Sequence, residues 1–307
     1  MGTLCMENPL PPTVRRDPPD SASDWREIVA RVGDLPPMPH VAARAIALVE
    51  QPETTASELA ELLARDTALT SRVLKIANSA MFSRQRKITT INQAVMTVGF
   101  KALKGIIIAA SLRQMNKNFG ALEQLLWENA IGTAMAATMI TQRLKRRYVE
   151  EIFVVGLLHG LGQIVLSTSR ETAADYGRVI AIIEADGVDF ITAETGVFGF
   201  AHPLVGALVA KKWNFSAETC HVILHYRDPL SGPVERSDTE EKAAIVQLAE
   251  MTIHLAGIGS PAGYPCQRES ARVLADALRL PGERDATVTD LAAETKIRFE
   301  KERHLYG

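Results

Sequence analysis

Residues 66–80 read DTALTSRVLKIANSA, and their pattern is that of a helix. Apolar residues recur there every three or four positions, which places their side chains on one face of an α-helix. They are Leu69, Val73, Ile76 and Ala77. Asn78 and Ser79 follow, and both residue types favour helix ends because their side chains hydrogen-bond to nearby backbone groups. The stretch therefore predicts a short helix with one buried face and a defined end.

Helical patterns continue on both sides of this stretch. Upstream, a helix-start signal at residues 24–27 opens one helix, the proline-rich residues 35–39 break it, and Thr55-Ala56-Ser57-Glu58 is a capping box that opens another. Downstream, apolar residues recur at helical spacing over about 91–98, 122–144, 152–166, 176–184, 190–198, 203–213, 218–225, 242–255 and 271–280. No run of alternating apolar and polar residues lies between hairpin turns. We therefore predict an all-α protein.

The composition of the 307 residues narrows the function classes. The 34 Lys and Arg residues balance 36 Asp and Glu residues, so the formal charge of -2 gives no general attraction to nucleic-acid phosphates or anionic lipid. The three cysteines, Cys5, Cys220 and Cys266, form no CxxC pair, which is typical of a reducing compartment. We expect a cytoplasmic protein.

Three segments bear on the organisation of the chain. Residues 1–22 are rich in proline, and we expect an extension outside the core. The tail from Ala271 to Gly307 is helical and charged, and we expect it to pack only partly and to form a frayed, solvated terminus. Residues 152–169 are uncharged over roughly the length of a membrane span, but glycines, a histidine, a glutamine and hydroxyl residues interrupt them. We therefore expect a buried core helix and its turn there, and no membrane span.

Four histidines fall in the middle of the second half of the chain. His159 ends an apolar run and precedes a Gly-Leu-Gly turn, and His202 stands before a proline in a first helical turn. His221 and His225 are four residues apart and share one helix face. That spacing suits one metal ion, as in the HExxH motif, but the general-base Glu of that motif is absent. A buried imidazole needs only one or two hydrogen-bond partners, so each histidine taken singly also fits a structural role.

Several separate motifs occur in one order along the chain. They are residues 35–39 (LPPMP), 66–80, 91–99, 156–162 (GLLHGLG), 194–206 and His225-Tyr226. Together they resemble the HDOD family of helical output domains, which is related to the HD-type phosphohydrolases. The resemblance covers about residues 31–230. It implies an N-terminal helical lobe over residues 23–119 and an HD-like helical bundle over residues 120–307 that includes C-terminal helices.

The resemblance also implies a metal site that has lost ligands. Catalytic relatives hold two or more metal ions through a leading His, a His-Asp doublet, further histidines and a late Asp. Here Asn129 replaces the leading His, Gly160 replaces the Asp of the doublet, and Tyr226 replaces one of two paired histidines. The remaining candidate ligands are His159, His202, His225 and Glu250, which together suit one divalent transition metal ion. Without the bridging carboxylate, two cations about 3.5–4 Å apart have no common ligand.

From this resemblance we expect a non-catalytic signal-transduction module. It would act through contacts with other signalling proteins, or by binding a small molecule or a nucleotide in the altered pocket. The alternative is a mononuclear metal-dependent phosphohydrolase that acts on a phosphoester or a nucleotide through the same four ligands.

Other residues stand out outside the histidines. Asp66, Arg72, Asn78 and Ser79 belong to the stretch that resembles the family signature. We expect them to shape the junction between the two lobes through hydrogen bonds, or simply to cap helices. Glu194 opens the segment that leads to His202 and is a further candidate. A basic cluster at residues 143–147 fits a solvated helix end better than a nucleic-acid surface, because only one aromatic residue, Tyr148, lies beside it.

Overall fold

The computed structural model describes residues 32–33, 35–79, 81–82, 87–115, 120–228, 237–282 and 284–306. The predicted extension at residues 1–22 and the predicted helix start at residues 24–27 lie outside these ranges. All regular secondary structure in the described part of the chain is helical, and no strand occurs there. The all-α prediction is confirmed.

The N-terminal helices confirm the pattern of residues 66–80. They are α2 (His40–Val49), α3 (Ala56–Leu63), α4 (Thr67–Ala77) and α5 (Ile91–Met115). All four apolar residues that predicted the helix at α4 are buried. Asp66 is its N-cap, with Oδ1 accepting a hydrogen bond from the Leu69 amide at 2.9 Å. The capping box at Thr55 and Glu58 is also present, so local sequence signals set these helix starts.

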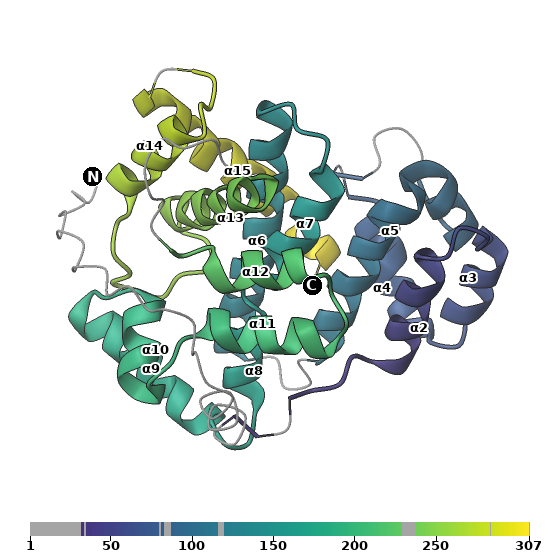
Figure 1. Ribbon diagram of the computed structural model, residues 1–307, viewed down its shortest axis with the longest axis horizontal. Coiled ribbons are helices and arrows are strands. Elements are labelled where there is room, and N and C mark those ends of the chain that lie inside the picture. The colour runs from purple at the N-terminus through teal and green to yellow at the C-terminus, as the bar shows by residue number, and fades with distance from the viewer. Residues whose placement is uncertain are drawn as a thin grey trace.

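The larger part of the molecule is built around one buried helix. Its elements are α6 (Ala121–Arg143), α7 (Val149–Leu158), α8 (Leu161–Thr168), α9 (Ala173–Asp186), α10 (Phe190–Phe198), α11 (His202–Lys212), α12 (Ala217–His225), α13 (Asp238–Leu255), α14 (Arg268–Ala277) and α15 (Arg284–Tyr306). Helix α6 is buried almost without interruption from Leu126 to Thr141 and packs mainly against α7 and α13. Helices α2 to α4 stand on one side of the molecule and α9 and α10 on the other (Figure 1).

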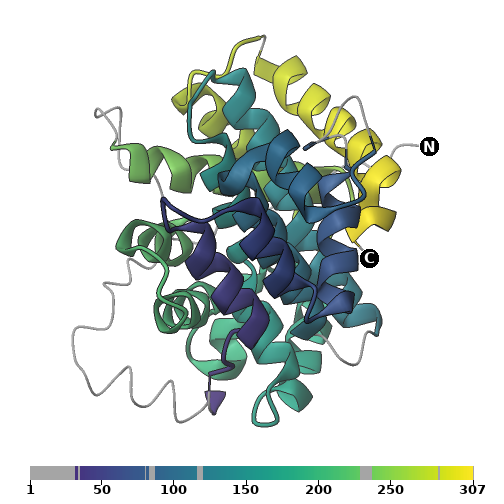
Figure 2. The same cartoon turned by 90° about the vertical axis from the view of Figure 1, so that its right-hand side faces the viewer.

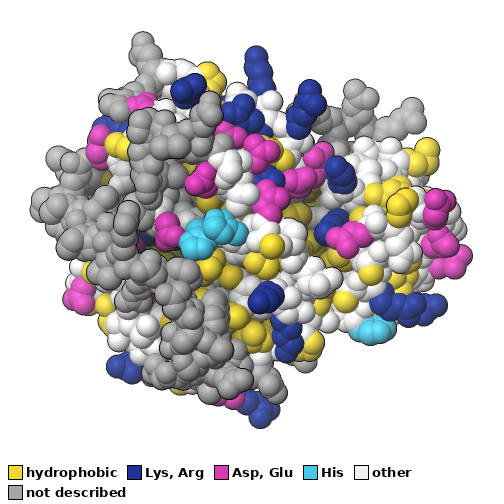
Figure 3. Space-filling model, viewed as in Figure 1, with side chains coloured by type: hydrophobic (Ala, Val, Ile, Leu, Met, Phe, Trp, Pro, Cys, Tyr) yellow, Lys and Arg dark blue, Asp and Glu magenta, His cyan; other side chains and the backbone are white. Residues whose placement is uncertain are grey.

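Two helical stretches are long and apolar enough to cross a membrane by length and composition, and the bent pair α10 and α11 would make a third. They are Ile91–Arg113 and Val149–Thr168, and 56% and 83% of their apolar windows are buried inside the fold. The second breaks into α7 and α8 at His159, as the polar interruptions predicted. On the face seen in Figure 3, hydrophobic side chains are scattered among charged ones. That the chain does not cross a membrane stays a prediction.

The C-terminal helix is packed more completely than the sequence suggested. Helix α15 lies against α4, α6, α13 and α14, and in Figure 2 it runs beside the blue N-terminal helices. Phe299, Glu302 and Tyr306 are buried although the helix is highly charged. The Tyr306 hydroxyl donates to Ser79 Oγ at 3.0 Å. Val288, Leu291, Phe299 and Tyr306 point into the core, whereas Ile297 is 70% exposed. The helix therefore packs along one face, and the expected frayed terminus was wrong for the last turn at Tyr306.

Candidate functional site

The buried end of α7 presents the first histidine of the site. From Ile152 onward helix α7 and the turn after it are buried, and His159 is fully buried there. Its Nδ1 lies 2.6 Å from the Gly156 carbonyl oxygen, which only accepts hydrogen bonds, so Nδ1 carries a proton. Its Nε2 is buried without a hydrogen-bond partner among the described residues, and lies 3.7 Å from Glu250 Oε1 on α13. That distance is too long for a direct hydrogen bond.

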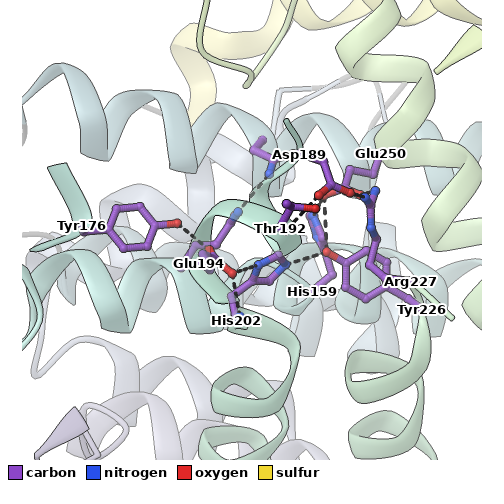
Figure 4. A network of polar contacts seen from close by, with 11 residues as sticks. His159, Tyr176, Asp189, Thr192, Glu194, His202, Tyr226, Arg227 and Glu250 are labelled. Atoms are coloured by element: carbon purple, nitrogen blue, oxygen red, sulfur yellow. Dashed lines mark hydrogen bonds and ion pairs between the residues drawn. The ribbon is translucent and has the colours of Figure 1, made fainter. Parts of the chain in front are cut away.

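The second histidine is held by a buried glutamate. Glu194 Oε2 accepts from the backbone amide and from Nδ1 of His202, both at 2.7 Å. Its Oε1 accepts from the Tyr176 hydroxyl at 2.8 Å. Burial, with Glu194 nearby, raises the pKa of Tyr176 well above its ordinary value, so the tyrosine remains a donor. Three donors thus satisfy this carboxylate and fix the ring of His202 (Figure 4).

A tyrosine hydroxyl joins His202 to the carboxylate of α13. Tyr226 Oη lies 2.7 Å from His202 Nε2 and 3.3 Å from Glu250 Oε1. Burial, then the nearby Glu250 charge, raises the pKa of Tyr226 well above its ordinary value. The hydroxyl keeps its single proton and shares it between the imidazole and the carboxylate. With His202 Nδ1 bonded to Glu194, neither ring nitrogen of His202 is open to a further ligand.

An arginine occupies the charged end of the network. Arg227 donates to Glu250 Oε2 at 2.8 Å and to Asp189 Oδ2 at 2.5 Å (Figure 4). Asp189 is also the N-cap of α10, since its Oδ1 accepts from the Thr192 amide at 2.9 Å. Burial alone would raise the pKa of Glu250, but the Arg227 guanidinium, helped by nearby histidines, holds it well below its ordinary value. The two carboxylates are therefore charged and paired with one cation.

The four predicted metal ligands do not come together. His159, His202 and Glu250 lie in the buried network, but His225 lies at the surface, where its Nδ1 meets Asp228 Oδ2 at 2.6 Å. The described residues contain no group of three or more His, Cys, Asp or Glu side chains that could hold a metal ion. Arg227 also places a positive charge on the carboxylate that a metal ion would need. The residues here do not fit the metal ion that the resemblance implied.

An amide pair lies at the position that the resemblance assigned to the leading histidine. Asn129 on α6 donates through Nδ2 to Gln163 Oε1 at 3.2 Å, and both residues are fully buried. Asn129 Oδ1 and Gln163 Nε2 have no hydrogen-bond partner among the described residues. Gly259, with φ of 66°, crosses Asn129 so closely that a Cβ atom there would lie 2.4 Å from Asn129 Cα. The loop after α13 thus packs directly against α6 at Asn129.

The signature residues of α4 have separate local roles. Asp66 caps the helix, and Asn78 fixes the chain after it through three hydrogen bonds of 2.7 Å, one to the Leu74 carbonyl and two with the backbone of Ile88. Ser79 reaches α15 through Tyr306. Arg72 Nη1 is buried without a hydrogen-bond partner among the described residues. Of these four side chains, Ser79 makes a hydrogen bond across the proposed junction, and the hydrogen bonds of Asp66 and Asn78 are local.

Sequence reasoning did not select Arg227, Asp189 or Tyr176. Asp189 carried a usable signal, because an acidic residue before Phe190 is a typical N-cap. Arg227 carried none of that kind, since its partners are 23 and 38 residues away.

Together the fold and this site define a class: an all-helical protein in which Arg227 pairs with the buried Glu250, and Tyr226 joins Glu250 to His202. The sequence model of the HDOD domain family matches residues 35–229. The chain therefore belongs to the HDOD family.

Solved structures agree with this assignment. An HDOD domain protein of unknown function from Geobacter sulfurreducens is 25% identical, with a TM-score of 0.73 over 92% of this chain and 95% of that one. A candidate phosphohydrolase from Shewanella amazonensis SB2B is 23% identical, with a TM-score of 0.66 over 91% and 97% of the two chains. A curated uncharacterised protein of Treponema pallidum is 24% identical over 235 residues. The match covers 74% of this chain but only 43% of that relative.

Proposed function

We propose that the chain is a non-catalytic signal-transduction module that acts through contacts with other signalling proteins, or by binding a small molecule or nucleotide in its altered pocket, in the cytoplasm. One observation carries the proposal: the Arg227 guanidinium holds Glu250, the carboxylate that stands where the catalytic relatives have a late metal ligand. A candidate signal transduction protein from Marinobacter aquaeolei VT8 shares the fold at 17% identity and a TM-score of 0.62.

The energetics of the ion pair support this function. Glu250 is 1% exposed and the Arg227 side chain 11% exposed, so neither charge is well solvated without the other. Separating a buried pair of this kind costs about 3–5 kcal/mol. A cation that competes for Glu250 would have to overcome that cost and the repulsion of the guanidinium. The ion pair therefore disfavours the binding of a metal ion at Glu250 and, with it, the activation of water by that ion.

The basic cluster does not favour a nucleic-acid partner. Arg146 donates twice to Glu241, at 2.9 and 2.6 Å, and Arg143 pairs with Glu294 at 2.6 Å. These contacts direct two of the four cationic side chains toward carboxylates of α13 and α15. This pairing supports the interpretation of residues 143–147 as a solvated helix end.

The alternative of a mononuclear phosphohydrolase rests on one observation. His159 Nε2 is buried, has no hydrogen-bond partner among the described residues and lies 3.7 Å from Glu250 Oε1. A histidine nitrogen and a carboxylate at that separation are two of the donors that a metal ion uses, but the described residues place no third His, Cys, Asp or Glu donor beside them.

A turnover screen separates the two functions. The full chain is assayed with Mn²⁺, Zn²⁺ and Mg²⁺ against a chromogenic phosphodiester and a panel of linear and cyclic nucleotides, beside His159→Ala and His202→Ala. We expect no turnover above the protein-free blank. Turnover that both substitutions abolish, in variants whose thermal midpoints show them to be folded, would refute the non-catalytic proposal. A thermal shift caused by one nucleotide and lost in His202→Ala would support its ligand-binding form.

A further inference from the structure

The surface of α12 carries a histidine pair outside the buried network. His221 and His225 are one helical turn apart, with ring centroids 4.3 Å apart and ring planes tilted by 40°. Histidine side chains gather at the surface over α12 in Figure 3, and acidic side chains lie beside them. Val222 and Tyr226, one residue further along in each case, are buried. The two imidazoles therefore share the outward face of the helix.

Asp228 fixes the orientation of one ring. Its Oδ2 lies 2.6 Å from His225 Nδ1. A carboxylate only accepts, so Nδ1 carries the proton and Nε2 keeps its lone pair. A carboxylate behind the ring is the arrangement found behind most metal-binding histidines, where it fixes the tautomer and makes the other nitrogen more basic. The geometry thus prepares His225 Nε2 as a ligand.

The second ring is free to complete the pair. His221 is exposed, and its ring lies beside that of His225. Partial burial, then the nearby His225, lower the pKa of His221. Glu240 and Asp228 lie near enough to act on that pKa in the opposite direction. Both carboxylates add negative charge beside the pair.

We infer that His221 and His225 form a surface binding site for one divalent transition metal ion of the zinc type, with Asp228 orienting His225. Imidazole nitrogens suit zinc, copper and nickel, whereas magnesium and calcium require oxygen ligands. Zinc takes four ligands, so two positions are left for water. With Zn–N bonds of about 2.0–2.1 Å, the centroids of two imidazoles on one tetrahedral ion lie about 5 Å apart. The two ring centroids, 4.3 Å apart, already lie close to that separation.

A thiolate is not needed for this site. Cys220 precedes His221, but its side chain is only partly exposed and its Sγ lies 3.9 Å from the Phe215 carbonyl oxygen. Burial raises the pKa of Cys220, which lowers the fraction of the thiolate form that binds metal. The inference stands apart from the buried network, because neither His221 nor Asp228 belongs to it.

Calorimetric titration with Zn²⁺ tests the inference on the full chain. We expect one ion per chain, with binding lost in His221→Ala and in His225→Ala, and affinity about 10–100-fold weaker in Asp228→Asn. His304→Ala, at an exposed histidine on α15, is the matched control and keeps wild-type affinity, as does Cys220→Ser. A tenfold excess of Mg²⁺ should not compete.

Zinc binding that survives both histidine substitutions would overturn the inference, and so would its absence in the wild-type chain. Loss of zinc binding in His159→Ala or His202→Ala, with His221→Ala unaffected, would instead place the ion in the buried network and overturn the surface site, whereas the non-catalytic proposal fails only on turnover. The two hypotheses therefore fail by different results.

Discussion

Replacing Arg227 by methionine tests the claim that this arginine balances the buried carboxylate. Methionine keeps much of the aliphatic volume and removes the charge. Glu250, at 1% exposure, would then be a buried carboxylate without its cation, whereas Asp189, at 22%, can be partly solvated. Removing one partner of a buried ion pair costs about 3–5 kcal/mol, so we expect the free energy of unfolding at pH 7 to fall by that amount.

The pH dependence makes the test more specific. In the wild type the pKa of Glu250 is held well below its ordinary value, so the pair stabilises the fold fully above the ordinary carboxyl pKa and loses this contribution as pH falls through the lower folded value. In Arg227→Met the positive charge that lowers the pKa of Glu250 is gone, so burial raises this pKa. The variant then regains stability by taking up a proton as pH falls. We expect the deficit relative to wild type to be larger at pH 7 than at pH 5.

Urea unfolding at both pH values measures these differences. Arg178→Met is the matched control, because Arg178 pairs with Asp175 at 3.0 Å with both side chains well exposed, and exposed pairs contribute about 0–1 kcal/mol. The double variant with Glu250→Gln should lose less than Arg227→Met alone, since the unpaired charge is gone. A loss below about 1 kcal/mol for Arg227→Met, or an equal loss at both pH values, would refute the role given to Arg227.

Two further predictions concern the packing around the site. Tyr306→Phe should lower the free energy of unfolding by about 0.5–1.5 kcal/mol through loss of the hydrogen bond to Ser79, and adding Ser79→Ala should cost little more; additive losses in urea unfolding would contradict the contact. Gly259→Ala should lower the thermal midpoint much more than Gly257→Ala, because both have positive φ but only Gly259 meets the Asn129 backbone; equal midpoints would show that the loop does not close over α6.

The sequence predicted the helices well because their signals are local. The spacing of Leu69 and Val73, the cap at Asp66 and the capping box at Thr55 each act within a few residues, and all are present in the structure. The break after α7 was also readable from the polar interruptions around His159. Such features depend on residues that are close in sequence, so they can be predicted without knowledge of the tertiary fold.

The site was predictable only in part. The resemblance selected His159, His202, Glu194 and Glu250, which the fold brings into one network. It placed His225 there too, but adjacent helix positions point about 100° apart, so with Tyr226 inward His225 faces outward. The partners of Arg227 lie on α10 and α13, and no local spacing encodes a contact between three separate helices.

The contact between Tyr306 and Ser79 has a consequence for the order of folding. It joins residues 227 positions apart, so α4 leaves the ribosome long before α15 exists. At about 5–20 residues per second, synthesis of the intervening chain takes roughly 10–45 s. During that time the part of α4 that α15 finally covers must face solvent, a chaperone or another part of the growing chain. The N-terminal helices therefore complete their core only after α15 has been synthesised.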